Sequence, residues 1–466
     1  MPKVVGQGDR EKWESARLLP ATGIRGKEEQ EKRATSALLA VMKAVPDFGL
    51  ALVAGTKAPK GKIHTYTEIR LQDGNRKTHI PDGAIVVERG NKRWSCLVEV
   101  KTGRASLDPD QVARYVDMAR AHEFDGLLTI SNQIRSDPGS LPYEVDGRKV
   151  GNLEIFHLSW WRVLTEAIVQ HRFRGIDDPD QAWVLGELIR YLDDERSGAG
   201  GFEGMGEEWV STRESARNQT LRASDFEAEA IAARWEQFVE YLCLHLSQEL
   251  GVEVKHQRPR GKAVGDRVKA SARHLADEGV LERAIRVPDS VGPLDIEANL
   301  RTGRVTTSVE LDAPKEGRAR TRVNWLLRQL KDAPEDLRIE VRFSQHRATR
   351  SELLRDCRDD PECLLLADDP KREPRAFVLA LSRKMGRKSG RKEGSFVAET
   401  RRQATDFYRD LVQNLSAPRP KAPKIREAKS DEDTDAKQDA AKGQAKRERE
   451  SRLHGFADFE AFTPTW

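Results

Sequence analysis

The spacing of hydrophobic residues in the first part of the chain changes from a helical to a strand period. A helix is predicted from about Lys27 to Val45, because apolar residues recur there at helical spacing until Pro46. Turn signals at 73–75 and 89–91 then separate short segments that favour strands. These segments are Leu50–Ala54, Thr65–Leu71, Ile80–Glu88 and Trp94–Lys101. They predict an antiparallel meander.

The helical period returns after this meander. Asp108-Pro109-Asp110 is typical of a helix start, with a capping side chain, a proline in the first turn and an acidic residue, and the helix runs to about His122. Two buried strands and two helices complete this part, with Ser159 as a cap: Gly126–Ser131, Leu153–Leu158, Trp160–His171 and Gln181–Glu195. The order predicts an α/β fold (an α+β mixed sheet) flanked by helices.

A glycine-rich run, SGAGGFEGMG, predicts a flexible linker and a domain boundary. Beyond it, Phe226–Leu250 has the pattern of a long amphipathic helix, and Arg322–Leu330 that of a shorter one. Strand-like segments lie at Val252–His256, Leu281–Val287, Leu294–Leu300, Val305–Leu311, Arg338–Phe343 and Phe377–Ser382. The predicted organisation is an extension (1–26), a first domain (27–196), the linker (197–223), a second α/β domain (224–385), a helical basic segment (386–415) and a charged tail (416–466).

Composition narrows this picture only slightly. The 466 residues are enough for two or three domains, and the net charge of +4 hides 80 basic and 76 acidic residues, so overall charge does not indicate a nucleic-acid binder. Four scattered cysteines without a CxxC pair disfavour a zinc site or a disulfide framework. The first residues lack the apolar core of a signal peptide, and no apolar run is long enough to span a membrane. We expect a cytoplasmic protein with no membrane partner.

The tail is predicted to be disordered, because Ser416–Glu450 has almost no large apolar residue. Aromatic residues return in the last segment, HGFADFEAFTPTW. This segment is either a short motif that docks on a protein partner or a free end with a few aromatic side chains.

The segment HIPDGAIVVERGNKRWSCLVEVKTG carries the chemistry. Period-two alternation places Glu99 and Lys101 on one face of the second strand, and Val98 and Val100 on the other. Two charges on one face of an apolar strand are costly to bury without a purpose. Asp82 begins the preceding strand, so its carboxylate can lie beside that of Glu99. Two carboxylates with carbonyl and water oxygens suit Mg²⁺ (or Mn²⁺), and a lysine there can orient the attacking water or hold a phosphate.

These residues resemble the motif of the PD-(D/E)XK nuclease superfamily, matched by Pro81-Asp82 and Glu99-Val100-Lys101. The next helix carries Gln111 and Tyr115 one turn apart, which is similar to the QxxxY motif of the RecB-like branch. The resemblance covers about residues 27–170 and implies a restriction-endonuclease-like fold.

The resemblance also implies a set of functional residues. Asp82, Glu99 and the carbonyl of Val100 would hold the metal, and Gln111 and Tyr115 would support the site and the nucleic acid. The first helix would supply a further acidic residue, Glu31 or Glu28. Basic residues near the motif would neutralise phosphates, although a solvated basic face has the same appearance: they are Lys57, Lys60, Lys62, Arg70 and Lys77, with Arg76 beside them.

The second domain repeats the broad order of helix, strands, helix and strand. Asp295 lies on one strand and Glu310-Leu311-Asp312 ends the next, so a degenerate nuclease-like copy is one interpretation, in which Asp312 replaces the lysine. Basic residues around Trp325 are compatible with nucleic-acid contact, and also with an ordinary charged helix: Arg318, Arg320, Arg322 and Arg328.

We therefore expect a Mg²⁺-dependent nuclease that hydrolyses phosphodiester bonds of DNA rather than RNA, in DNA repair, restriction or defence. The alternatives are an inactive nucleic-acid-binding platform within a stress-response or defence assembly, and an interaction scaffold with no nucleic-acid role.

Overall fold

The computed structural model describes residues 14–15, 27–73, 76–135, 140–143, 145, 147–258 and 263–418. The described residues up to Pro418 form one compact unit. The charged tail from residue 419 with its aromatic end, most of the N-terminal extension, the turn residues Gly74 and Asn75, and the side chain of Glu28 lie outside the described residues.

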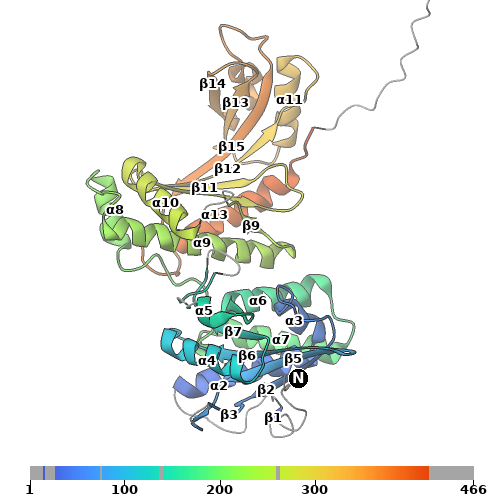
Figure 1. Ribbon diagram of the computed structural model, residues 1–466. Coiled ribbons are helices and arrows are strands. Elements are labelled where there is room, and N and C mark those ends of the chain that lie inside the picture. Colours follow the sequence, from blue (N-terminus) through green and yellow to red (C-terminus); the bar gives the residue numbers. More distant parts are fainter. Residues whose placement is uncertain are drawn as a thin grey trace, which may run out of the picture. The chain divides into compact units, whose positions relative to one another are not determined.

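The first domain is built on a mixed sheet, as predicted (Figure 1). Its strands are antiparallel from β1 to β6 and parallel from β6 to β8. In spatial order the described strands are β1 (Glu14–Ser15), β2 (Lys62–Thr67), β5 (Gly83–Arg89), β6 (Lys92–Val100), β7 (Gly126–Ser131) and β8 (Glu154–Ser159), with a separate hairpin of β3 (Leu71–Gln72) and β4 (Thr78–His79).

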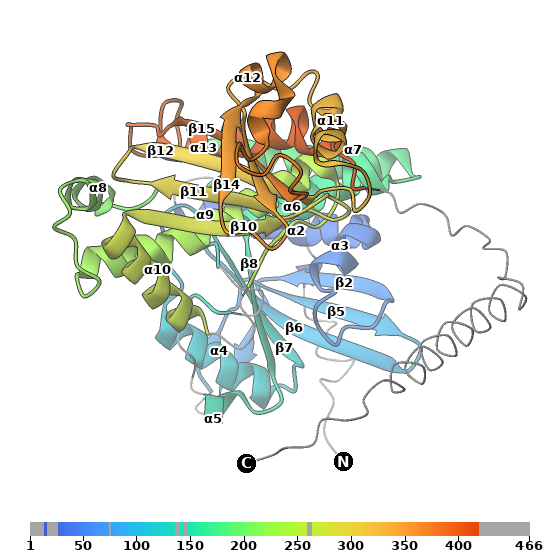
Figure 2. The ribbon, with the colours of Figure 1, turned by 90° about the horizontal axis from the view of Figure 1, so that it is seen from above.

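Helices cover both faces of this sheet (Figure 2). Val98 and Val100 pack with α2, α3, α6 and α7, whereas Leu97 packs with α4, which confirms the predicted alternation along β6. The helical elements are α2 (Lys27–Ala44), α3 (Pro46–Leu52), α4 (Pro109–Ala121), α5 (Gly147–Val150), α6 (Trp160–Val169), the π-helical turn Gln170–Arg174, α7 (Pro179–Asp193) and the 3₁₀ turn Glu195–Ser197.

Two predicted helix caps are confirmed. The Asp108 carboxylate accepts a hydrogen bond from the backbone N–H of Asp110 at 3.0 Å, and the Ser159 hydroxyl accepts one from Arg162 at 3.1 Å. Each satisfies a backbone donor that has no partner within its helix. Both helices therefore start where the local sequence predicts.

The predicted strand at Leu50–Ala54 is wrong, because this segment belongs mostly to helix α3. Pro46 begins a second helix instead of only ending the first, since its fixed backbone angle suits the first helical turn. Gly49 lets this helix pack closely, because a Cβ atom there would lie 2.4 Å from the Met42 carbonyl oxygen and 2.7 Å from Ile63. Burial of Phe48 and Leu52 thus overrides the strand propensity of an apolar run.

The second domain is an antiparallel sheet with helices. Its described strands, in spatial order, are β14 (Thr349–Leu353), β13 (Arg338–Phe343), β15 (Pro374–Lys384), β12 (Arg304–Asp312), β11 (Leu294–Asn299), β10 (Val280–Arg286) and β9 (Lys255–His256). The helices are α8 (Trp209–Arg217), α9 (Phe226–Leu250), α10 (Val264–Glu278), α11 (Ala319–Gln329), α12 (Leu354–Asp359) and α13 (Phe396–Asp410), with 3₁₀ turns at Pro361–Leu364 and Val412–Asn414. Strand β14 and helices α8, α10 and α12 were not predicted.

This sheet does not repeat the topology of the first. Strand β7 lies directly beside β6 and parallel to it, whereas β15 is inserted between β12 and β13 and is antiparallel to both. The degenerate copy suggested by Glu310 and Asp312 is therefore contradicted by strand order.

The glycine-rich run is not the predicted flexible linker. Phe202 and Met205 are buried in the apolar cluster of the second domain, and the Gly204 carbonyl accepts a hydrogen bond from Arg234 at 2.7 Å. The aromatic ring of Phe202 lies 5.3 Å from that of Phe238 on α9. Aromatic burial therefore orders a segment whose composition favours flexibility.

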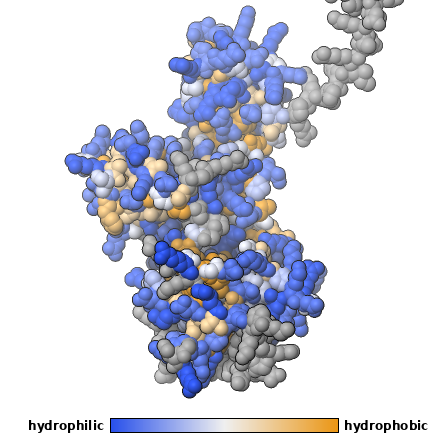
Figure 3. Space-filling view, viewed as in Figure 1, coloured by the Kyte–Doolittle hydropathy of each residue, from blue (hydrophilic) through white to orange (hydrophobic). Residues whose placement is uncertain are grey.

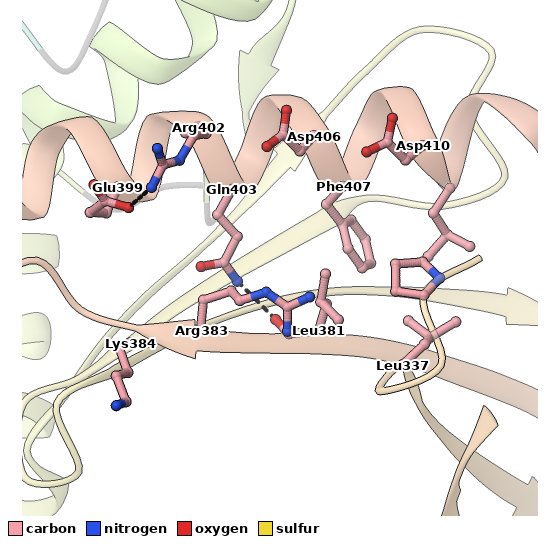
Figure 4. A pocket seen from close by; sticks show the side chains of 12 residues that line it. Leu337, Leu381, Arg383, Lys384, Glu399, Arg402, Gln403, Asp406, Phe407 and Asp410 are labelled. Carbon is pink, nitrogen blue, oxygen red and sulfur yellow. Dashed lines mark hydrogen bonds and ion pairs between the residues drawn. The ribbon is translucent and has the colours of Figure 1, made fainter. Parts of the chain in front are cut away.

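The segment 386–415 belongs to the second domain because α13 packs on its sheet. The buried Gln403 amide donates to the carbonyls of Val305 and Leu381, at 3.0 and 2.8 Å (Figure 4). A cavity of about 500 Å³ lies beside this contact, with acidic and basic side chains in its wall, among them Asp406 and Arg383. This mixed lining contains no arrangement related to the predicted chemistry.

No single helix among the described residues is long and apolar enough to cross a membrane. One bent pair, Glu29–Ala44 with Pro46–Leu52, meets the length and composition criteria together, but turns through 116°. Hydrophilic residues cover most of the face seen in Figure 3.

A buried polar network on β7 and β8 makes stability depend on pH. His157 donates from Nε2 to the Gln133 carbonyl at 3.0 Å, and its Nδ1 lies 3.0 Å from the Thr129 hydroxyl, which contacts the Tyr143 hydroxyl at 2.9 Å. Burial and the charge of Arg135 lower the pKa of His157 from 6.5 to about 4. The fold thus holds the neutral imidazole.

We expect the free energy of unfolding to fall as pH decreases from 6.5 towards 4. In this range His157 binds a proton in the unfolded state but stays neutral in the folded state. The contribution of this group reaches about 3 kcal/mol at the acid end. In urea unfolding, His157→Gln should therefore show a smaller difference in stability between neutral pH and acid than the wild type. The exposed His346→Gln serves as the control, and an unchanged difference in the His157 variant would contradict this account.

Candidate active site

The strand register brings the predicted carboxylates together. Gly83 of β5 pairs with Val98 of β6, so the preceding residue Asp82 lies across from Glu99. Lys101 follows the last residue of β6, and its backbone N–H donates to Ile130 on β7 at 2.8 Å. The site therefore stands where the antiparallel and parallel parts of the sheet meet.

Glu99 is the centre of the site and is only 1% exposed. Its Oε1 accepts hydrogen bonds from the Lys101 ammonium and from the Gln111 side-chain amide, each at 2.7 Å. The same amide nitrogen lies 3.4 Å from the Tyr115 hydroxyl. The predicted Gln111 and Tyr115 pair on α4 thus faces the carboxylate, as its spacing requires.

Asp82 is attached to the end of β6. Its Oδ2 accepts a hydrogen bond from the backbone N–H of Val100 at 2.7 Å. Glu31 on α2 completes the group, with Oε2 3.5 Å from the Lys101 nitrogen. The structure therefore unites Asp82, Glu99, Lys101 and the predicted helix residue Glu31.

Burial and mutual repulsion shift the titration of these groups. Burial, and then the nearby charge of Asp82, raise the pKa of Glu99 to about 8. Burial also raises the pKa of Asp82, against the opposing effects of the Val100 hydrogen bond and the Lys101 charge. For Lys101, burial alone would lower the pKa, but the Glu99 carboxylate outweighs it and the pKa lies above its usual value.

The donor set fits a hard divalent cation. Asp82 and Glu99 offer carboxylate oxygens, and the Val100 carbonyl points to the same side of β6 as the Val100 N–H that Asp82 binds, because both groups of a strand residue share one direction. Within the described ranges, no set of three or more His, Cys, Asp or Glu side chains is placed to hold a metal. A site of two carboxylates, one carbonyl and water is the arrangement that Mg²⁺ accepts.

The backbone that follows Lys101 is clamped by side chains that the sequence did not single out. Trp160 donates from Nε1 to the Lys101 carbonyl at 2.9 Å. The Asn132 amide donates to the carbonyls of Gly103 and Gly198, both at 2.8 Å, and accepts from the N–H of Gly200 at 2.6 Å. The glycine-rich run thus braces the loop after the lysine.

Gln30 adds a second brace from α2. Its amide donates to the Arg196 carbonyl at 2.7 Å, and its oxygen lies 3.5 Å from the Thr102 hydroxyl. The close packing requires Gly198, because a Cβ atom there would lie 2.5 Å from the Gln30 side chain. The sequence did not indicate this role of Gln30, because its partners, Arg196 and Thr102, lie far from it along the chain.

The predicted cluster of phosphate-binding lysines is divided between the two ends of the sheet. Lys62 pairs with Glu88 at the end of β5 opposite Asp82, and Lys57 lies beside Glu154 at the start of β8. Lys60, two residues before Lys62, shares this distant end. The expectation that these three lysines crowd the site is therefore wrong. A strand rises by about 3.3 Å per residue, so the two ends of one strand lie far apart and residues near its two ends do not share a site.

Arg70 and Lys77 do lie at the site's end of the sheet. The backbone N–H of Glu68, two residues before Arg70, donates to the Asp82 carbonyl at 3.1 Å, and Lys77 immediately precedes β4, which leads into Asp82. Both side chains are exposed. They remain candidates for phosphate contact.

In the second domain, one predicted nucleic-acid contact is a structural residue. Arg322 is buried and donates to the carbonyls of Gly317, Pro374 and Lys315, besides pairing with Glu373. Its guanidinium holds loops together and is not available to a ligand. Arg318, Arg320 and Arg328 are exposed.

Comparisons with known proteins add no relative: no protein-family model, no curated protein and no solved structure matches the chain. The functional interpretation therefore depends on the site itself.

The raised pKa of Glu99 generates a stability prediction. Between pH 4.5 and 8 the folded protein keeps a proton on Glu99 that the unfolded chain releases, so this group destabilises the fold as pH rises. Glu99→Gln should therefore be more stable than the wild type at pH 8.5 in EDTA, by up to about 5 kcal/mol, with little advantage at pH 5. Urea unfolding with exposed Glu393→Gln as control measures this. A variant less stable than the wild type at high pH would refute it.

Asn132→Ala should release the glycine-rich run from the loop after Lys101. We expect a loss of stability of about 1–3 kcal/mol from the unpaired backbone groups. Amide hydrogen exchange at Gly103 and Gly200 should accelerate, with exposed Asn218→Ala as the control. Exchange at the wild-type rate would show that Asn132 does not hold these segments.

Proposed function

We propose that this protein is a metal-dependent nuclease that hydrolyses phosphodiester bonds of DNA, with its active centre at Asp82, Glu99 and Lys101. The observation that carries the proposal is the buried Glu99 carboxylate, set beside the half-buried carboxylate of Asp82 and the ammonium of Lys101 at the end of β6. Burial of like charges destabilises a fold, so such groups persist where chemistry needs them. The resemblance of the motif to PD-(D/E)XK nucleases supports the same conclusion.

Asp82, Glu99 and the Val100 carbonyl would hold the metal. The bound cation would polarise the phosphate and stabilise charge on the leaving oxygen. Because Glu99 retains a proton near neutral pH in the protein alone, cation binding would require that proton to leave.

Lys101 would act through its positive charge. Its raised pKa keeps the ammonium protonated at neutral pH, so it donates hydrogen bonds to the attacking water or to a phosphate oxygen and does not accept a proton. The attack would form a bond from the water oxygen to phosphorus and break the bond to the leaving oxygen. The proton lost by the water would pass to solvent, and the leaving oxygen would take up a proton from solvent.

Gln111 and Tyr115 would orient the site. Gln111 donates to Glu99 and contacts Tyr115, so the two side chains hold the carboxylate in one position and present donors beside it. Arg70 and Lys77, exposed at this end of the sheet, would neutralise phosphates of the bound strand. A role in DNA repair, restriction or defence is the setting that we propose for this activity.

The test is cleavage of linear, nicked and circular DNA with Mg²⁺, Mn²⁺ or EDTA. Lys101→Ala should cut at least about 100-fold more slowly than the wild type, because a charged donor next to the reacting phosphate is lost. Lys57→Ala, which removes a lysine at the far end of the sheet, should cut at the wild-type rate. Circular substrates then separate endonuclease from exonuclease action.

Two outcomes would overturn the proposal. Full activity of Lys101→Ala would place the chemistry elsewhere. Uncut DNA with every metal, from folded wild-type protein, would favour the inactive binding platform.

A further inference from the structure

Three arginine side chains gather on one side of the second domain without a paired acid. Arg213 and Arg217 lie one turn apart on α8, which packs on α9 (Figures 1 and 2). Arg217 approaches the turn at Gly303, where a Cβ atom would lie 3.9 Å from its Nη2. The Gly303 carbonyl accepts a hydrogen bond from the backbone N–H of Met385, and Arg387 follows two residues later in the chain. We call Arg213, Arg217 and Arg387 the arginine cluster.

The arginine cluster is electrostatically unfavourable on its own. Like charges one turn apart destabilise a helix. Burial, followed by the charges of Arg217 and Arg387, lowers the pKa of Arg213, and Glu214 offsets only part of this. Arg213 also stacks over the Trp209 ring at 5.7 Å, which fixes its guanidinium. None of the ion pairs within the described ranges includes a member of the cluster. Such an arrangement is stabilised by an anionic ligand.

The loop beside the cluster is also basic. Residues 384–392 contain five lysines and arginines and no acidic residue, and we call them the basic loop. Arg387, Lys388, Arg391 and Lys392 are exposed.

The basic loop touches the segment that braces the active site. Arg391 pairs with Glu195 at 2.7 Å, and a Cβ atom on Gly204 would lie 3.3 Å from the Gly390 Cα. The intervening run reaches the loop after Lys101, since Gly103 donates to Gly198 at 2.8 Å. The path from Lys101 to Arg387 follows eleven residues of chain, one hydrogen bond and one close contact, so it spans at most about 50 Å. That upper limit corresponds to roughly fifteen base pairs of DNA.

We propose that the arginine cluster and the basic loop bind the phosphodiester backbone of the nucleic acid whose scissile bond lies at Lys101. This inference rests on the proposed function. Guanidinium groups bind phosphates in a bidentate manner, and a backbone that continues from the active site presents phosphates at this range. A repeated phosphate charge matches an extended row of cations better than an acidic protein segment does. The second domain thus extends the substrate path, and a duplex of about fifteen base pairs is long enough to reach from Lys101 to the arginine cluster.

The experiment measures binding in EDTA, by fluorescence anisotropy, of DNA hairpins with stems of about 8 and about 24 base pairs over a range of salt concentrations. The wild type should bind the long stem at least about tenfold more tightly than the short one. Arg213→Gln/Arg217→Gln/Arg387→Gln should lose this gain, and its slope of log affinity against log salt should decrease by about 2–3. Binding of the short stem should change little.

The matched control is Lys57→Gln/Lys60→Gln/Lys62→Gln, which neutralises three exposed lysines at the end of the first sheet opposite Asp82. It should bind both stems like the wild type. Circular dichroism and thermal melting establish that both triple variants are folded.

Three outcomes would overturn the inference: wild-type binding and salt slope in the cluster variant, an equal loss in the control variant, or no salt-dependent binding by the wild type. Cleavage is scored separately. If the wild type cuts DNA but the cluster variant binds normally, this surface is wrong and the nuclease stands. If the cluster binds long stems but nothing is cut, the surface stands and the nuclease function is wrong.

Discussion

The arrangement of the first domain depends on the placement of one buried carboxylate, Glu99. Ionisation of this group is costly in an apolar sheet, although two donors, Lys101 and Gln111, hydrogen-bond to its Oε1 at 2.7 Å each. The neighbouring Asp82 adds repulsion and raises the pKa of Glu99 to about 8. The two neighbouring carboxylates repel each other when both are ionised, and a bound cation would offset that repulsion. The arrangement that makes the site electrostatically unfavourable is therefore the one that the proposed metal binding requires.

Holding this site requires rigid surroundings. The β6 strand ends in residues whose backbone groups are bound by Asp82, Trp160 and Asn132. These partners come from a strand start, a helix start and a strand end, so the position of Lys101 depends on β5, α6 and β7 together. The glycine-rich run joins them, since glycine alone permits the close approach at Gly198. A segment with the composition of a linker therefore braces the candidate site.

The second domain has a different architecture from the first, and it supports the candidate site of the first domain from outside. Its antiparallel sheet lacks the parallel pairing that joins β6 and β7, and Glu310 pairs with Arg342 of strand β13 in the same domain. It supplies instead an ordered anchor for the glycine-rich run through Phe202, and a row of cations on α8 and the basic loop. Its contribution to the molecule is support and charge.

Local pattern by itself determined much of the protein. Alternation along β6 assigned Glu99 and Lys101 to one face, spacing on α4 paired Gln111 with Tyr115, and the caps at Asp108 and Ser159 set two helix starts. These features depend on neighbours within a few residues, so the sequence carries them directly.

Tertiary structure decided everything that joins distant segments. The segment Leu50–Ala54 has an apolar, strand-like sequence, but its packing near Ile63 favours a helix. Lys57 and Lys62 lie a few dozen residues before the site in the sequence, but the direction of the strands places them at the opposite end of the sheet. Asn132 and Arg387 gave no local signal, because their partners lie far along the chain. Strand register and side-chain burial determine those contacts. Neither can be predicted from the spacing of hydrophobic and polar residues within one segment.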